Sequence, residues 1–179
     1  MNENEHIRSF IDYYRELEPS PEYAVLLKGK WGSGKTWFIK NYLHSRNLDG
    51  KGKAVLFISL YGLSSYAEIE QKFFAKLHPV LSSKGAALVG GVAKGLSKTT
   101  VKIDIIEPIK NLFRRSKNDE LNLPSYLTDT SDYLLIFDDL ERCAMPIAKV
   151  MGYVNHLVEI KGYKAILLAN EEEIEKRRK

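Results

Sequence analysis

The sequence predicts an α/β fold in which helices cover both faces of a parallel sheet. Four short apolar runs have the composition of strands buried in such a sheet, and they lie at residues 23–28, 53–59, 133–137 and 164–169. Segments with helical spacing of apolar residues alternate with these runs, which is typical of parallel strands joined by right-handed crossovers. With 179 residues, the chain has the length of one domain, or of one domain with an insertion.

The chain begins with a helix that is expected to end before Pro19. Its apolar side chains form one stripe at helical spacing, consisting of Ile7, Phe10, Ile11, Tyr14 and Leu17. We expect this helix to pack on the sheet; the wall of an adenine pocket is the alternative place for it. After the first strand, a second helix is expected to start near Lys35. Its apolar residues are Trp37, Phe38, Ile39, Tyr42 and Leu43.

The strand at 53–59 leads to a third helix. Ser65 and Glu68 form the Ser-x-x-Glu pattern of a capping box, which marks the beginning of that helix. A further amphipathic helix has Pro146 in its first turn and precedes the last strand. Its apolar residues are Ile147, Val150, Met151, Val154, Leu157 and Val158. The chain then closes on a charged helical start at 171–179.

Residues 29–36 read Gly-Lys-Trp-Gly-Ser-Gly-Lys-Thr and match G-x-x-x-x-G-K-[ST], the phosphate-binding P-loop. The glycines let backbone N–H groups surround a phosphate chain, and the following helix presents its positive dipole end to it. Lys35 is expected to reach the β- and γ-phosphates, and the Thr36 hydroxyl to bind Mg²⁺. The residues expected to bind the nucleotide are Gly29, Lys30, Trp31, Gly32, Ser33, Gly34, Lys35, Thr36 and Trp37. A turn that merely joins strand to helix is the alternative, but it does not require Lys35 and Thr36.

A second candidate site follows the third apolar run, where residues 138–142 read Asp-Asp-Leu-Glu-Arg. This is the form of a Walker B element, in which a buried strand carries a carboxylate to the edge where open α/β sheets bind ligands. Asp138 is expected to hold Mg²⁺ through a water molecule and to complete the shell begun by Thr36. Asp139 is the first candidate for the base that acts on the attacking water, and Glu141 is the second. An ordinary strand before an acidic helix start is the alternative.

Together, Gly-x-Trp-Gly-Ser-Gly-Lys-Thr and Asp-Asp-Leu-Glu-Arg-Cys resemble the KAP family of P-loop NTPases, within the wider AAA+/STAND-like group of ATPases. Lys30 stands where the family usually has an acidic residue, and Glu141 where it usually has a third aspartate. The resemblance implies binding and hydrolysis of ATP, with Asp138 on Mg²⁺ and Asp139 near the hydrolytic water. Many bacterial relatives are associated with defence against phages and plasmids.

The long separation of the second strand from Walker B also fits the additional-strand type of P-loop NTPase core. In that type another strand lies between the Walker A and Walker B strands, and the run at 164–169 is expected to take that place. Asn170 at its end then lies where such ATPases have a polar sensor of the γ-phosphate or the water. Asn170 with Glu173 also forms a helix N-cap pair, and the two interpretations are compatible.

Related ATPases continue into a fifth strand and a helical lid that often carries an arginine to the nucleotide. We therefore expect the core at 1–179 to be the N-terminal portion of a longer protein, or to be completed by a partner protein or by another copy in a homo-oligomer. Hydrolysis by this chain alone is expected to be slow, because an arginine supplied to the site is worth about 10³–10⁵ in rate.

The KAP family often carries transmembrane helices between its two Walker elements. The apolar run at 85–93 lies between Lys84 and Lys94 and is far shorter than the roughly 20 residues that a membrane span requires. We therefore interpret 81–117 as a soluble insertion, and we expect no membrane span in this chain. The basic residues of the insertion either solvate a loop or contact anionic lipid or nucleic acid.

Charge and cysteine content restrict the partners and the compartment. There are 27 Lys and Arg residues against 23 Asp and Glu, a net charge of +4 that favours polyanionic partners without identifying one. Cys143 is the single cysteine, which rules out internal disulfides and fits a reducing cytoplasm. The polar start of the chain is unlike a signal peptide, so a cytoplasmic location is expected.

The leading interpretation is a Mg²⁺-dependent ATPase that acts as a switch or motor, with Lys35, Asp139, Glu141 and Asn170 as its catalytic candidates. A nucleotide-binding assembly module without turnover is the second interpretation. A small-molecule P-loop kinase is the third, and it is disfavoured because such kinases usually have an Arg-rich lid. Arg142 is expected either to bridge to a neighbouring subunit's phosphate or to pair with Glu141.

Overall fold

The computed structural model describes residues 4–48, 55–77 and 133–176. The expected insertion at 81–117 lies outside the described residues. The chain divides into two compact units, the first formed by Met1–Ser64 with Ser125–Lys179 and the second by Ser65–Pro124.

Helix α3 (Tyr66–Leu77) is the described part of the second unit, together with Ser65 before it. Ile69 and Phe73 are four residues apart, share one face of this helix and are buried. The backbone N–H of Glu68 donates to the Ser65 hydroxyl at 3.3 Å, which is the serine half of the expected capping box.

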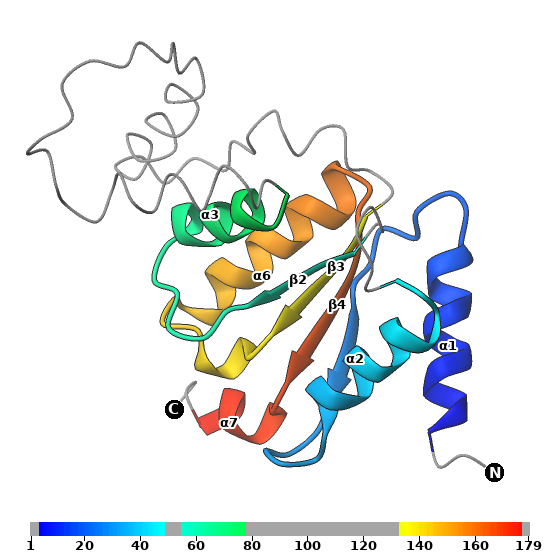
Figure 1. The fold of residues 1–179 in the computed structure, drawn as a ribbon. Coiled ribbons are helices and arrows are strands. Elements are labelled where there is room, and N and C mark those ends of the chain that lie inside the picture. Colours follow the sequence, from blue (N-terminus) through cyan, green and yellow to red (C-terminus); the bar gives the residue numbers. More distant parts are fainter. Residues whose placement is uncertain (1–3, 49–54, 78–132, 177–179) are drawn as a thin grey trace, which may run out of the picture. The chain divides into compact units, whose positions relative to one another are not determined.

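The first unit is built on a four-stranded sheet whose strands are all parallel (Figure 1). The strands are β1 (Val25–Lys28), β2 (Val55–Ser59), β3 (Leu134–Asp138) and β4 (Lys164–Ala169). Their order is β1-β4-β3-β2, so the strand that precedes the P-loop and the strand that precedes Asp139 are separated by β4. Because all strands run in the same direction, the segments that follow them meet where the strands have their carboxyl ends.

Helices cover both faces of this sheet, as expected (Figure 1). The helical elements of the first unit are α1 (Glu5–Glu16), α2 (Lys35–Ser45), the 3₁₀ turn η3 (Leu140–Arg142), α6 (Ile147–Asn155), the π-helical η4 (His156–Ile160) and α7 (Glu171–Lys176). On one face, Ile136 and Leu168 share a core with Tyr14 of α1 and Ile39 of α2. Leu167 points to the other face by the alternation of strand side chains, and there it lines a cavity together with residues of α6.

Strand β1 lies at the edge of the sheet, which corrects the expectation that it is buried. In the described part of the chain β1 pairs with β4 alone. Leu26 is 46% exposed, because its side chain lies on the face opposite to the Val25 and Leu27 side chains and lines a cavity there. Three residues expected in apolar stripes are also exposed, Phe10 of α1 at 46%, Trp37 of α2 at 70% and Met151 of α6 at 42%. Each of these helices packs through a narrow band of side chains, and residues at the margin of that band remain in contact with solvent.

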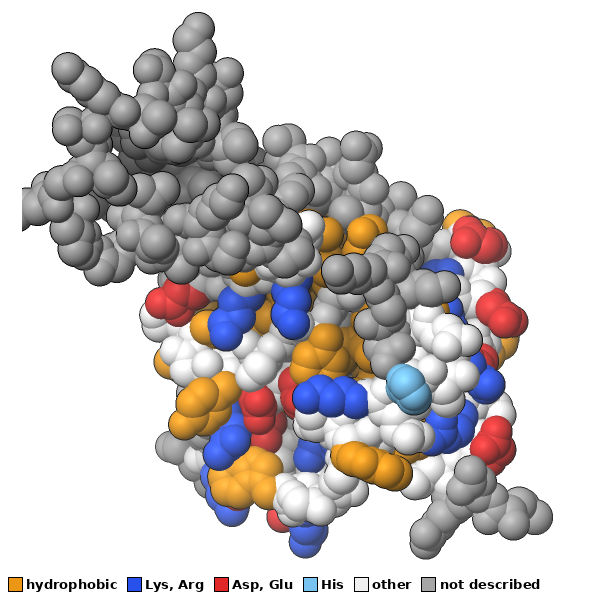
Figure 2. Space-filling model, viewed as in Figure 1, with side chains coloured by type: hydrophobic (Ala, Val, Ile, Leu, Met, Phe, Trp, Pro, Cys, Tyr) orange, Lys and Arg blue, Asp and Glu red, His pale blue; other side chains and the backbone are white. Residues whose placement is uncertain are grey.

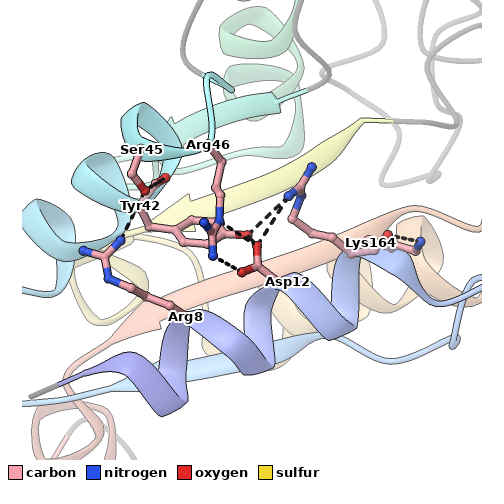
Figure 3. A network of polar contacts seen from close by, with 7 residues as sticks. Arg8, Asp12, Tyr42, Ser45, Arg46 and Lys164 are labelled. Atoms are coloured by element: carbon pink, nitrogen blue, oxygen red, sulfur yellow. Dashed lines mark hydrogen bonds and ion pairs between the residues drawn. The ribbon is translucent and has the colours of Figure 1, made fainter. Parts of the chain in front are cut away.

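A polar network fastens α1 to α2 (Figure 3). Arg8 donates to Asn41 at 2.7 Å and to Ser45 at 3.2 Å. Asp12 accepts from the Tyr42 hydroxyl at 2.8 Å and pairs with Arg46. Burial alone raises the pKa of Asp12, but the hydrogen bonds from Arg46 and Tyr42 outweigh it and lower that pKa below its usual value. The network therefore holds α2, the helix that starts at the P-loop, in a defined position.

Tyr14 connects α1 to the sheet through a buried hydroxyl. The hydroxyl donates to the carbonyl oxygen of Tyr23 at 2.6 Å and accepts from the backbone N–H of Ala165 at 2.9 Å. Burial raises the pKa of Tyr14 to about 12, so the group stays protonated at physiological pH.

Replacing Tyr14 by Phe is expected to lower the free energy of unfolding by about 1–3 kcal/mol, because one buried and one partly buried backbone group lose a partner. Urea unfolding would measure this change. Tyr13→Phe is the matched control, since Tyr13 is 57% exposed and its loss of a hydroxyl is expected to change stability little. Equal effects of the two substitutions would show that the Tyr14 bonds do not stabilise the fold.

Candidate functional site

The P-loop runs from Gly29 to Gly34 and joins β1 to α2. Gly32 and Gly34 have φ values of +78° and +83°, in the left-handed region that favours glycine. Gly34 is the N-cap of α2, so the loop delivers the chain directly into a helix start. A Cβ atom at Gly29 would lie 2.7 Å from the Ser33 hydroxyl oxygen, which shows how closely the loop folds on itself. This backbone can present N–H groups to an anion.

Lys35 lies on the loop that precedes it. Its Nζ donates to the carbonyl oxygens of Gly29 at 2.6 Å and Lys30 at 3.1 Å. The ammonium group therefore stays at the beginning of α2, where its charge adds to the positive end of the helix dipole. This position suits attraction of a phosphate group.

Thr36 and Asp138 are 102 residues apart in the sequence and are in direct contact. The Thr36 hydroxyl donates to Asp138 Oδ2 at 2.7 Å. Asp138 is only 5% exposed, and burial raises its pKa, although hydrogen bonds from Thr36 and the Asp139 backbone act in the opposite direction. A hydroxyl and a buried carboxylate are oxygen ligands of the kind that Mg²⁺ prefers, and a cation there would offset the cost of burying the charge. The pair fits a magnesium ion.

Asp139 lies beside this pair and has a left-handed backbone, with φ of 59°. Its N–H donates to Asp138 Oδ1 at 2.9 Å, and its own Oδ2 accepts from the Ser59 hydroxyl at 2.9 Å. The side chain is 29% exposed, so water reaches it. Ser59 is a site residue that the sequence analysis did not identify. The feature that could have pointed to Ser59 is its position at the end of β2, where the pairing of β2 with β3 places it opposite Asp138.

Glu141 is 6% exposed, and both of its carboxylate oxygens accept hydrogen bonds. Oε1 accepts from the indole Nε1 of Trp31 at 2.7 Å, and Oε2 accepts from the backbone N–H of Asn170 at 3.1 Å. Asn170 is 4% exposed, and its carbonyl oxygen accepts from the N–H groups of Glu173 and Ile174 at 3.2 Å each. Asn170 therefore occupies the start of α7, as the N-cap interpretation expects.

Arg142 stacks between two exposed aromatic rings. Its guanidinium carbon is 5.6 Å from the ring centroid of Trp31 and 4.8 Å from that of Tyr61. Its ion pair is with Asp139 at 3.7 Å, which differs from the expected pairing with Glu141. Figure 2 shows hydrophobic and basic side chains next to one another at the lower left of the face drawn there. Tyr61 was not identified from the sequence, since its contact depends on how the turn after β2 meets η3.

Two ion pairs join α7 to the P-loop and to the end of β1 that precedes it. Lys28 pairs with Glu171 at 2.8 Å, and Lys30 pairs with Glu172 at 3.0 Å. All four side chains are about half exposed or more, so each pair contributes little to stability. Trp37, the other aromatic residue expected at the nucleotide, is largely exposed on the first turn of α2.

A cavity of about 420 Å³ lies between β1, α6 and α7, and Glu171 is among the residues that line it. Apolar side chains line it, among them Leu26, Leu140 and Met151, and its charged lining residues are glutamates. No P-loop residue faces the cavity. Because glutamates repel phosphate, the lining of this cavity does not suit the phosphate groups of a nucleotide.

In the part of the chain that the structure describes, no helix combines the length and the apolar character required to traverse a lipid bilayer. Neither the curated proteins nor the solved structures compared with the chain gave a match. Among protein families, the KAP family P-loop domain matches residues 4–178, nearly the whole sequence. The match covers the loop, the sheet and the acidic turn after β3 in one stretch, and the chain therefore belongs to the KAP family of P-loop domains.

Proposed function

We propose that this chain is a Mg²⁺-dependent ATPase domain that acts as a switch or motor. The observation that carries the proposal is the 2.7 Å contact between the Thr36 hydroxyl and the Asp138 carboxylate. Thr36 follows the P-loop lysine and Asp138 ends β3, so the contact joins a phosphate-binding loop to an acidic strand end. If residues 29–36 were only a connecting turn and residues 138–142 only an acidic helix start, this contact between the Thr36 and Asp138 side chains would not be expected.

Each residue of the site has a distinct role in this proposal. The P-loop amides and Lys35 bind the phosphates, and Thr36 with Asp138 hold the metal ion. Bound Mg²⁺ supplies positive charge that neutralises the β- and γ-phosphates. Asp139, which is partly exposed, orients or deprotonates the attacking water. Asn170 at the end of β4 serves as a polar sensor of the nucleotide state.

Several finer features belong to the same proposal. The observed place of β4 between β1 and β3 supports a core of the additional-strand type. We infer a cytoplasmic protein that acts as a homo-oligomer or together with a partner protein. We also infer a role in bacterial defence against phages, supported by the association of many KAP relatives with defence. Loss of phage resistance in cells that carry a Lys35→Ala variant would test that role.

The metal site is tested by Thr36→Ala and Asp138→Asn. Both variants are expected to weaken ATP binding in the presence of Mg²⁺ by about ten- to a hundredfold, the range typical of changes around a metal site. With EDTA present, the variants and the unchanged chain are expected to bind ATP alike. Isothermal titration calorimetry with and without Mg²⁺ would measure both effects.

Glu159→Gln is the matched control, because this exposed carboxylate on η4 accepts only a local bond from Asn155 among the contacts seen in the described chain. Variants that bind Mg²⁺ and ATP as well as the unchanged chain would refute the metal site. Binding of ATP without release of phosphate would instead select the assembly module, the alternative that shares the same loop.

A further inference from the structure

We propose that Glu141 is a positioning residue and not the hydrolytic base: its carboxylate ties the indole of Trp31 in the P-loop to the end of β4. The inference rests on the proposed ATPase function, and it assigns a separate task to each of two neighbouring carboxylates. Asp139 would act on water, and Glu141 would set the conformation of the phosphate-binding loop.

Hydrogen bonds fix the Glu141 carboxylate between the P-loop and the end of β4, and we call this connection the Glu141 bridge. Its two oxygens accept from two different segments, the Trp31 indole at 2.7 Å and the Asn170 backbone at 3.1 Å. Hydrogen bonds to an ionised group are roughly twice as strong as those between neutral groups. A carboxylate that is 6% exposed needs such partners, because an unpaired buried charge is strongly unfavourable.

The accessibility of the two carboxylates separates their roles. The Asp139 side chain is 29% exposed; its carboxylate accepts from the Ser59 hydroxyl and forms an ion pair with Arg142 at 3.7 Å. Glu141 directs both oxygens at N–H donors of the protein and is nearly inaccessible to solvent. A general base must reach the water that it deprotonates. This requirement favours Asp139 over Glu141 as the general base.

The Glu141 bridge contacts the P-loop through the side chain of Trp31. Its indole N–H is held by Glu141, and its ring is in contact with the Arg142 guanidinium at 5.6 Å. The next residue, Gly32, has φ of +78° in a backbone that glycine leaves free to move. Two contacts on one side chain therefore restrain a loop that its glycines make adaptable. The same carboxylate joins this loop to Asn170, so a change in the loop would reach the start of α7.

The test combines Glu141→Gln, Trp31→Phe and the double variant. Glutamine keeps one acceptor but turns an NH₂ group toward one of the two donors, and phenylalanine keeps a ring but removes the indole N–H. Each single variant is expected to weaken ATP binding by about tenfold, on the order of one hydrogen bond to a charged group. The double variant is expected to be no weaker than either single one, because both remove the same contact. Glu159→Gln serves again as the carboxylate-to-amide control.

A second readout needs no nucleotide. The chain has two tryptophans, so its ¹H–¹⁵N spectrum contains two indole N–H signals, and Trp31→Phe identifies the Trp31 signal by removing it. Glu141→Gln is expected to shift that signal, whereas Glu159→Gln is not. The spectrum also shows whether each variant is folded.

A shifted indole signal with non-additive losses of affinity supports the positioning role. An unmoved signal, additive losses, or a 10²–10⁴-fold fall in turnover at unchanged ATP affinity for Glu141→Gln, a range of about the size expected for a base, would overturn it. A chain that neither binds nor hydrolyses ATP would remove the proposed function, while the indole signal would still decide whether the bridge exists.

Discussion

Asp139→Asn is expected to lower the rate of ATP hydrolysis by about 10²–10⁴-fold while leaving ATP affinity within a few-fold of that of the unchanged chain. Asparagine has the same shape as aspartate, and it tolerates the left-handed φ of 59° at this position. It also keeps an oxygen that can accept from Ser59, which lies 2.9 Å from Asp139 Oδ2. The substitution therefore removes the charge and little else.

Phosphate release under single-turnover conditions would measure the fall, and calorimetry would show that binding persists. The matched comparison is Glu141→Gln, which is expected to act mainly on affinity. If Asp139→Asn turned over ATP at the original rate, the assignment of the base to Asp139 would be wrong. If Glu141→Gln alone stopped turnover, the two roles would have to be exchanged.

Lys35→Ala is expected to reduce both binding and hydrolysis. Removing a cation that neutralises transferring phosphate is expected to cost about 10²–10³ in turnover, similar to the loss of one donor in an oxyanion site. Lys35→Arg keeps the charge but replaces a compact ammonium with a planar fork, so it is also expected to be impaired. Measured rates and dissociation constants for ATP would test both variants.

Lys40→Ala provides the control for Lys35→Ala on the same helix. Lys40 is exposed on α2 and lies 5.3 Å from the ring centroid of Phe57, away from the loop. Its removal eliminates one positive charge without touching the P-loop. Equal losses in Lys35→Ala and Lys40→Ala would mean that Lys35 acts through general charge alone, and its assigned contact with phosphate would then be wrong.

Local patterns were sufficient for most of the fold. The four apolar runs correspond to β1 to β4, and the helical stripes correspond to α1, α2 and the joined α6 and η4. The capping pattern at Ser65 placed the start of α3 correctly. The burial of individual apolar side chains was less predictable where they lie at the margin of a packed surface, as the exposed residues Phe10, Leu26 and Trp37 show. Apolar character says that a side chain favours burial, but the neighbours in the fold decide whether it is covered.

The residues of the site also divide into those that local sequence patterns identify and those that only the structure reveals. Lys35, Thr36 and Asp138 belong to motifs whose spacing reflects the geometry of a phosphate and a metal ion, so short segments of sequence identify them. Ser59, Tyr61 and the partners of Glu141 carry no such local pattern. Trp31 and Glu141 are 110 residues apart, and their bond depends on the order of strands and on the path of two turns.

The sequence by itself determined that a phosphate-binding loop follows one buried strand and that adjacent carboxylates follow another, because these features depend on residue type and on neighbours along the chain. Only the tertiary structure decided what each carboxylate touches, because the parallel sheet brings the ends of distant strands to one edge. Asp138 meets Thr36 there, Asp139 meets Ser59, and Glu141 bridges Trp31 and Asn170.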